Sequence, residues 1–174
     1  MWRAEMHAVR TWDARLCVAM NRALRYGAVR PFLRAVSWLG DGIFWYSLML
    51  ALLLAQGDAA APVVLHMVLV GALCTATYKL LKRRTLRPRP YEALLTVAPG
   101  ARPLDAFSFP SGHTLHAVGF SIVALTYCPA LAALLVPFAL LTAVSRVVLG
   151  LHYPTDVLAG AAIGAAIATP SLWI

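Results

Sequence analysis

The chain has 174 residues, enough for one domain, of which 61% are hydrophobic and only 13% are charged, with a mean hydropathy of +0.74. A soluble globular domain usually carries about twice that charged fraction, so the composition argues against a soluble protein and for a surface that largely faces lipid. The net charge of +8 would indicate nucleic-acid binding in a soluble chain, but here the basic residues flank apolar runs, which favours contact with anionic lipid head groups.

Residues 2–26 carry apolar side chains at helical spacing, with arginines largely between them. The apolar positions are Trp2, Met6, Val9, Leu16, Met20 and Leu24. This pattern predicts an amphipathic helix that lies in the membrane interface, and a helix packed on a partner protein is the alternative.

Five apolar stretches follow, most of them close to the length that crosses a hydrocarbon core of about 30 Å. They are expected at 35–56, 62–81, 114–128, 130–149 and 156–172. Gly160 and Gly164 in the last stretch lie at a small-xxx-small spacing, which favours close contact with a neighbouring helix. We therefore predict an all-α integral membrane helical bundle of about five transmembrane helices plus the N-terminal interfacial helix.

The basic residues are distributed unevenly about this topology. The N-terminus, the 82–112 loop and the 150–155 turn fall on one side of the membrane, and the 57–61 loop and the C-terminus fall on the other. All 15 lysines and arginines lie on the first side or at its edge. Because cytoplasmic loops carry an excess of lysine and arginine, this asymmetry indicates that the first side faces the cytoplasm.

The three cysteines, Cys17, Cys74 and Cys128, are odd in number and form no CxxC pair. This arrangement argues against a disulfide framework or a zinc knuckle, so we interpret them as small packing residues. The sequence also lacks a cluster of acidic residues suited to a metal, and we expect neither a metal nor another cofactor.

Three polar segments stand out, and all three fall on the arginine-rich side. In chain order they are Lys82-x6-Arg89-Pro90, Pro110-Ser111-Gly112-His113 and Ser145-Arg146-x5-His152-x3-Asp156. Each contains residue types that bind or transfer phosphate.

The cations of these segments are suited to a doubly charged phosphate. Lys82 and Arg89 supply positive charge, and Arg146 adds a planar guanidinium that can bind phosphate in a bidentate manner. Ser111 and Gly112 open a predicted helix, where free backbone N–H groups favour an anion. The sequence therefore predicts that these five residues bind phosphate.

The two histidines supply the remaining chemistry. His152 can attack phosphorus as a neutral imidazole, and Asp156, four residues later, can fix its tautomer and stabilise the charged ring. His113 beside the phosphate can donate a proton to the leaving oxygen and later accept one from water. The predicted device is phosphoryl transfer through a covalent phosphohistidine.

The three segments, in this order and without a departure, resemble the signature of the type 2 phosphatidic-acid phosphatase family, which is itself similar to the vanadium haloperoxidases. The resemblance covers roughly residues 30–172 and implies an all-helical core with metal-independent hydrolysis of lipid phosphates or diphosphates. It implies the same roles: phosphate binding by Lys82, Arg89, Ser111, Gly112 and Arg146, with His113 as acid, His152 as nucleophile and Asp156 as its partner. Many bacterial members have six spans, whereas here the interfacial helix replaces the first.

On this basis residues 1–174 are expected to form a single membrane phosphatase domain, with residues 2–26 as interfacial helix and 35–172 as transmembrane core. The remaining polar residues receive ordinary interpretations. Arg83, Arg84 and Arg87 are expected to contact lipid head groups. Asp41 is expected to cap a helix or pair locally, and His116 to pack beside the site.

The expected substrate is a lipid phosphate or diphosphate, with the bilayer as the second partner and no nucleic acid. The alternatives are polyprenyl diphosphate, polyprenyl-phosphate sugar phosphate, phosphatidylglycerophosphate, phosphatidic acid and lipid A. A lipid phosphotransferase of the same fold and a non-catalytic assembly or transport protein are the competing functions. The membrane spans argue against a haloperoxidase, and the sequence leaves the oligomeric state open.

The expected location is a bacterial inner membrane, crossed several times. The family resemblance would more often place the active site on the outer face of that membrane, in conflict with the charge asymmetry. Removal of one N-terminal span inverts the rest of the topology if the N-terminus stays inside. We therefore favour a cytoplasmic active site, and the outer face remains the alternative.

Overall fold

The computed structural model describes the backbone of residues 2–173 and the side chains from residue 11 to residue 173. Within that range the chain is helical and contains no strand, as the sequence predicts. The helices are α1 Trp2–Asn21, α2 Val29–Trp38, α3 Phe44–Gln56, α4 Ala61–Thr85, α5 Pro90–Ala93, α6 Gly112–Tyr127, α7 Ala132–Val148 and α8 Pro154–Ser171. The predicted apolar positions Trp2, Met6 and Val9 have side chains outside the described residues.

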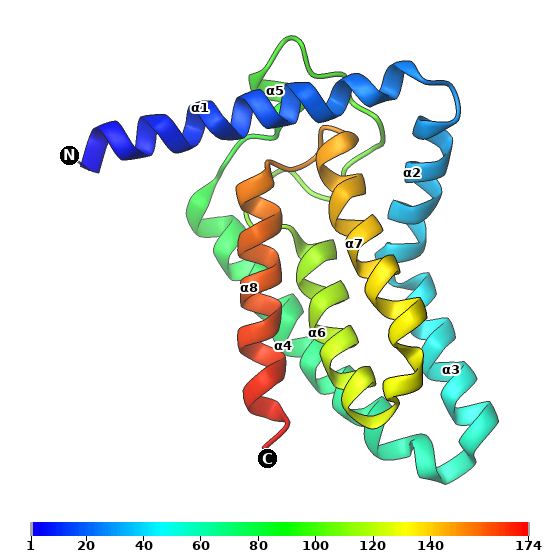
Figure 1. The fold of residues 1–174 in the computed structure, drawn as a ribbon. Coiled ribbons are helices and arrows are strands. Elements are labelled where there is room, and N and C mark those ends of the chain that lie inside the picture. Colours follow the sequence, from blue (N-terminus) through cyan, green and yellow to red (C-terminus); the bar gives the residue numbers. More distant parts are fainter. Residues whose placement is uncertain (1, 174) are drawn as a thin grey trace.

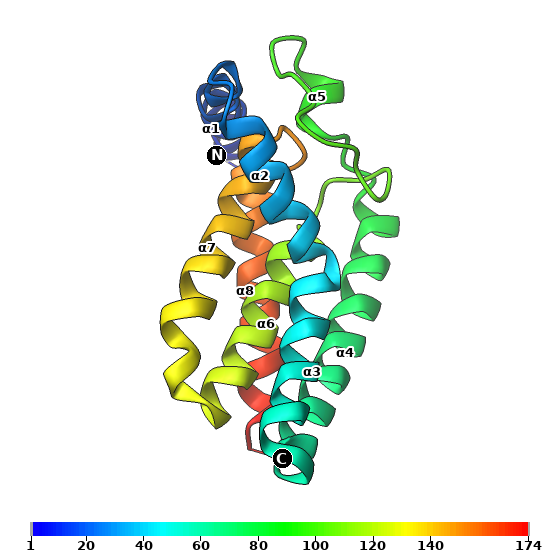
Figure 2. The same ribbon diagram turned by 90° about the vertical axis from the view of Figure 1, so that its right-hand side faces the viewer.

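The long helices form an elongated bundle, and α1 lies across one end of it (Figure 1). Seen from the side, α3, α4, α6, α7 and α8 run roughly along a common axis (Figure 2). Helix α6 packs against α4, α7 and α8, so it occupies the middle of the bundle. The loop after α4, the short α5 and the α7–α8 turn gather at the same end as α1 (Figure 1).

Helices α6 and α8 approach each other closely because α8 presents glycine at the contact. A Cβ atom built on Gly160 would lie 2.6 Å from the carbonyl oxygen of Ser111, and one on Gly164 would lie 2.3 Å from that of Leu115. Neither position has room for a side chain. The predicted close packing at these two glycines is confirmed, and it holds the start of α8 against the start of α6.

The first predicted span is interrupted in the structure. The chain is already helical at Val29, and a π-helical turn over Leu39–Ile43 separates α2 from α3. Asp41 and Gly42 have non-helical backbone angles there, and the φ of Gly42 is 118°, which favours glycine. The sequence pattern of a continuous apolar run missed this break.

Leucine side chains cover much of the outer surface of the bundle. Exposed examples are Leu50 and Leu54 on α3, Leu65, Leu69 and Leu73 on α4, Leu140 on α7 and Leu158 on α8. Such a surface suits contact with lipid rather than water. Two helical stretches of the described chain are long and apolar enough to cross a membrane, Val29–Ala93 and Pro129–Val148. The prediction of about five crossings stays a prediction.

Helix α1 is tied to the bundle by polar as well as apolar contacts. Cys17 packs with Val147 and Tyr153. The amide of Asn21 donates to the carbonyl oxygens of Ala98 and Val148, at 2.9 and 3.0 Å, and its oxygen accepts the N–H of Ala98. The inner face of this amphipathic helix is therefore a docking face for the chain itself, at the end where the predicted site lies.

Candidate active site

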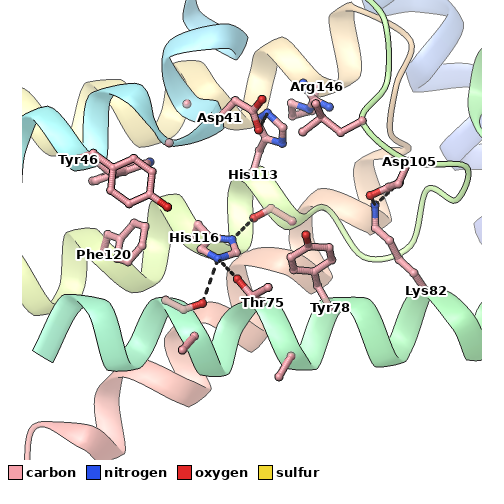
Figure 3. A pocket seen from close by; sticks show the side chains of 18 of the residues that line it. Asp41, Tyr46, Thr75, Tyr78, Lys82, Asp105, His113, His116, Phe120 and Arg146 are labelled. Atoms are coloured by element: carbon pink, nitrogen blue, oxygen red, sulfur yellow. Dashed lines mark hydrogen bonds and ion pairs between the residues drawn. The ribbon is translucent and has the colours of Figure 1, made fainter. Parts of the chain in front are cut away.

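A cavity of about 600 Å³ opens between α3, α4, α6 and α7. Six of the eight predicted site residues line it: Lys82, Arg89, Gly112, His113, Arg146 and His152. They gather near Asp41 and Asp105, and the cavity continues past aromatic residues such as Tyr46 and Phe120 (Figure 3). Segments far apart in the sequence thus meet at one polar end of an otherwise largely apolar cavity.

Two of the predicted phosphate-binding cations share a carboxylate. Lys82 Nζ lies 2.7 Å from both carboxylate oxygens of Asp105, and Arg89 Nη2 lies 2.7 Å from one of them. Partial burial raises the pKa of the Asp105 carboxyl, but the hydrogen bond and charge of Lys82 and the charge of Arg89 outweigh it and lower that pKa below its usual value. Asp105 is therefore ionised, and a phosphate binding to these cations has to compete with it.

Arg89 is held by several further contacts. Its side chain is 1% exposed, and it donates to the backbone oxygens of Leu151 at 2.8 Å and Asp105 at 2.9 Å. Its Nη1 also lies 3.5 Å from His152 Nε2. These contacts fix the guanidinium between the loop after α4 and the α7–α8 turn, where its charge faces the imidazole.

His152 lies in the turn between α7 and α8 with its two ring nitrogens in different surroundings. Nε2 faces Arg89, and Nδ1 lies 3.7 Å from Asp156 Oδ2. Burial, followed by the charges of Arg146, Arg89 and Lys82, holds the pKa of the His152 imidazole well below its usual range. The ring is therefore neutral at neutral pH, with a nitrogen lone pair available for attack.

Asp156 is fully buried in the first turn of α8. Its Oδ2 accepts the backbone N–H of Tyr153 at 2.8 Å, so the carboxylate caps the helix that carries it. The separation from His152 Nδ1 is within the range of an ion pair but too long for a hydrogen bond. The Asp156 carboxylate and the His152 ring are therefore neighbours, as the spacing predicts, but they form no hydrogen bond in this structure.

His113 faces a carboxylate that the sequence did not connect with it. Its Nε2 lies 3.7 Å from Asp41 Oδ1, across from the break between α2 and α3 (Figure 3). The prediction that Asp41 caps a helix or pairs locally is wrong, because Asp41 lines the cavity and its carboxylate faces His113. His116 lines the same cavity and hydrogen-bonds Thr75 at 3.1 Å, as expected for a neighbour of the site.

Arg146 reaches the cavity from the last turn of α7 and is 3% exposed. Its Nη1 donates a short hydrogen bond to the Ser37 hydroxyl. Its Nε is buried and has no hydrogen-bond partner among residues 11–173. A buried guanidinium with an unused N–H donor is suited to an anion that enters the cavity.

Ser111 does not line the cavity. It is fully buried, its N–H donates to the Asp156 carbonyl oxygen at 3.0 Å, and its hydroxyl pairs with Thr114 Oγ1 at 3.0 Å. The N–H that the sequence assigned to phosphate is thus already used, and it joins the start of α6 to the start of α8. Gly112, the next residue, does line the cavity.

A family model described as the PAP2 superfamily matches residues 60–174, which include all three motifs. The chain belongs to the PAP2 superfamily. The resemblance to type 2 phosphatidic-acid phosphatases that the motifs suggested is therefore confirmed.

Two solved structures resemble this PAP2 protein along most of its length. The transmembrane PAP2-type phosphatidylglycerolphosphate phosphatase of Bacillus subtilis is 25% identical, with a TM-score of 0.76 over 95% of this chain and 85% of that one. Aquifex aeolicus LpxE is 28% identical, with a TM-score of 0.73 over 92% of this chain and 94% of that one. Both likenesses extend beyond the matched family region, and the predicted class of helical membrane protein is confirmed.

One basic residue of this PAP2 protein lies where the sequence did not place it. Arg87 was expected at lipid head groups, but its Nη1 lies 2.6 Å from Asp156 Oδ1 and its Nη2 lies 2.7 Å from Asp13 Oδ2. That prediction is wrong because α4 ends before Arg87, with Leu86 in the left-handed conformation, and Arg87 then lies against α1 and the start of α8.

Sequence reasoning on this PAP2 protein thus missed four charged residues around the site: Asp13, Asp41, Arg87 and Asp105. None is a defining residue of a motif, since Arg87 is one of the six unspecified positions between Lys82 and Arg89, and their partners lie 16 to 142 residues away along the chain. The one available signal was their charge in a chain with few charged residues, since a buried charge needs a partner.

Proposed function

We propose that this PAP2 protein is a membrane phosphatase that hydrolyses a lipid phosphate or diphosphate through a phosphohistidine at His152. The observation that carries the proposal is the meeting of Lys82, Arg89 and Arg146 with two histidines at the polar end of one cavity. Residues 1–174 act as one phosphatase domain in this proposal. The family membership and the likeness to a known phosphatase of Bacillus subtilis support it.

The first step forms a bond between His152 Nε2 and phosphorus and breaks the bond from phosphorus to the leaving oxygen. Nε2 is the ring nitrogen on the side of Arg89, while Nδ1 faces Asp156. His113 in its protonated form donates a proton to the leaving oxygen and becomes neutral, and Asp156 stabilises the positive charge on the His152 ring. The cations hold the phosphoryl oxygens and stabilise their charge in the transition state.

The second step returns the enzyme to its starting state. Water attacks phosphorus, His113 accepts a proton from that water, and the bond between phosphorus and Nε2 breaks. Inorganic phosphate is released and His152 is again neutral. Both steps use the side chains described above, so we expect hydrolysis without a metal ion.

The apolar part of the cavity supports a lipid substrate. Trp45, Met49, Val68 and Phe120 are among its lining residues. A phosphate held by the cations would leave its hydrocarbon tail against these side chains and the surrounding lipid. Phosphatidylglycerophosphate, which the neighbour from Bacillus subtilis hydrolyses by its name, is one candidate. Phosphatidic acid, polyprenyl diphosphate, polyprenyl-phosphate sugar phosphate and lipid A are the others.

Purified protein in detergent is expected to release inorganic phosphate from at least one of these lipids, with EDTA present. A phosphate monoester without a hydrocarbon tail, such as glycerol phosphate, serves as the control and should be hydrolysed far more slowly. No release from any lipid would contradict the proposal. Loss of the lipid phosphate to an added alcohol, without release of inorganic phosphate, would favour the phosphotransferase alternative.

We further propose that the protein crosses a bacterial inner membrane with the site on the cytoplasmic side. The site lies at the end of the bundle that carries α1 and the basic loop after α4, so the positive-inside rule supports this orientation. Leu95 in that loop is 105% exposed and Asp58 lies exposed in the 3-10 turn between α3 and α4.

A single cysteine introduced at either position reports the orientation. In a Cys128→Ser background, which removes the native half-buried thiol, we expect an impermeant thiol reagent to label Asp58→Cys but not Leu95→Cys in intact cells. The reverse pattern would place the site outside. It would then favour polyprenyl diphosphate and lipid A over phosphatidylglycerophosphate.

A further inference from the structure

A carboxylate of the N-terminal helix reaches the helix that carries Asp156. Asp13 on α1 is 1% exposed, and its Oδ1 accepts the backbone N–H of Thr155 at 3.0 Å. The Thr155 hydroxyl donates a short hydrogen bond to the other oxygen of the same carboxylate. Asp13 therefore acts as a cap for the first turn of α8 from 142 residues away, where a negative charge is stabilised by the helix dipole.

A single guanidinium joins this cap to Asp156. Arg87 donates from Nη2 to Asp13 Oδ2 at 2.7 Å and from Nη1 to Asp156 Oδ1 at 2.6 Å. Nη1 also donates to Thr155 Oγ1 at 2.9 Å, and the guanidinium lies 4.0 Å from the centre of the Tyr153 ring. Both carboxylates are buried, and the one cation between them reduces the repulsion between their charges.

These contacts decide how Asp156 meets the histidine. Oδ1 is taken by Arg87, and Oδ2 accepts the Tyr153 N–H and faces His152 Nδ1 at 3.7 Å. Turning the plane of the carboxylate away from this orientation would weaken both hydrogen bonds. Arg87 therefore helps to hold the orientation of Asp156 towards His152, and Asp13 in turn holds Arg87.

We propose that Asp13 and Arg87 are positioning residues for the His152–Asp156 pair. Helix α1 then belongs to the catalytic apparatus rather than serving only as a membrane-surface helix. This inference rests on the proposed phosphatase function, because it assigns the two residues to the nucleophile of that reaction. Neither residue lines the cavity, so neither contacts the substrate.

The variant Asp13→Asn tests this role with little change of shape. The amide can still accept the Thr155 N–H, but it carries no charge for Arg87. We expect kcat to fall by about 10- to 100-fold, because a displacement of roughly 1 Å at a catalytic group can lower the rate by about 100-fold. KM and the inhibition constant of inorganic phosphate should stay within about twofold, since Lys82, Arg89 and Arg146 are untouched.

The variant Arg87→Lys gives a second test if Asp13→Asn does not yield monodisperse protein. Lysine keeps the charge, but it lacks the planar fork that spans two carboxylates, so kcat should again fall while KM does not change. Controls are Asp58→Asn and Arg84→Gln, both at exposed positions outside this network, which should behave as the wild type. The melting temperature of each variant in detergent reports its stability separately.

A double-mutant cycle completes the experiment. If the two residues act as a unit, Asp13→Asn combined with Arg87→Gln should lower kcat no further than Arg87→Gln alone. Additive losses, or an unchanged kcat in Asp13→Asn with an active wild type, would overturn this inference and leave the proposed function in place. A rise in the phosphate inhibition constant in step with the loss of kcat would show a general structural role instead. An inactive wild type would remove the proposed function and the inference with it.

Discussion

Replacing His152 by alanine is expected to abolish phosphate release from every lipid that the wild type hydrolyses. Loss of the nucleophile in an enzyme that forms a covalent intermediate typically lowers kcat by about 10⁴- to 10⁶-fold. Here the loss should lie at the upper end, because the carboxylate nearest to Lys82 and Arg89, Asp105, is already paired with both cations. His113 faces Asp41 and is assigned to proton transfer.

The covalent intermediate provides a more direct measurement than turnover. After brief mixing with radiolabelled lipid phosphate, the denatured wild-type protein should carry label that is lost in acid and retained in base, as a phosphorus–nitrogen bond predicts. His152→Ala should carry none. His66→Ala is the matched control, since His66 pairs with Tyr127 and Ser171, outside the cavity. Turnover in His152→Ala at a wild-type rate would contradict a histidine nucleophile.

The helices were largely predictable because the solvent imposes their pattern. A chain in lipid has to satisfy its backbone hydrogen bonds internally, so an apolar run of about 20 residues is a helix almost by necessity. The predicted stretch 62–81 lies within α4, and 114–128 nearly coincides with α6. The break at Asp41 and Gly42 was missed because hydropathy does not register a change of backbone angle at one glycine.

The site divides in the same way. The motif residues that line the cavity were identified because each role in phosphate transfer needs a particular residue type. Within each motif these residues also lie close together in the sequence. Asp105 and Asp13 were missed because the role of a carboxylate depends on its cationic partner. The fold brings each of them to a cation that is distant in the sequence. Arg87 was misplaced for the same reason, since a basic cluster next to a membrane normally contacts head groups.

Asp105 and Asp13 also balance the charge of the site. Lys82 and Arg89 share Asp105, and Arg87 is shared by Asp13 and Asp156. Arg146 differs, because it forms no ion pair with a carboxylate among the described residues, and Asp41 in the same cavity faces His113. Its guanidinium can therefore still donate hydrogen bonds to a substrate, because the buried Nε has no hydrogen-bond partner among the described residues.

Arg146→Lys is accordingly expected to lower kcat by about 10³-fold, at the lower end of the range reported for arginines that stabilise a phosphoryl-transfer transition state. Lysine keeps the positive charge, so substrate binding should weaken less than turnover. Lysine lacks the planar guanidinium that can contact two phosphoryl oxygens at once. Its ammonium also binds water more strongly than a guanidinium does, so burying it costs more free energy. The measurement is kcat and KM on the preferred lipid, with Arg102→Lys in the exposed loop as the matched control.

The direction of the change in KM separates two roles for Arg146. A guanidinium that acts mainly in the transition state gives a loss in kcat with KM nearly constant, whereas one that binds the ground-state phosphate gives a rise in KM with kcat preserved. The hydrogen bond to Ser37 is a check on the geometry, because it anchors Nη1 and aims the remaining donors. Ser37→Ala should therefore reproduce a smaller part of the same loss in kcat, and a wild-type rate in both variants would show that Lys82 and Arg89 hold the phosphate alone.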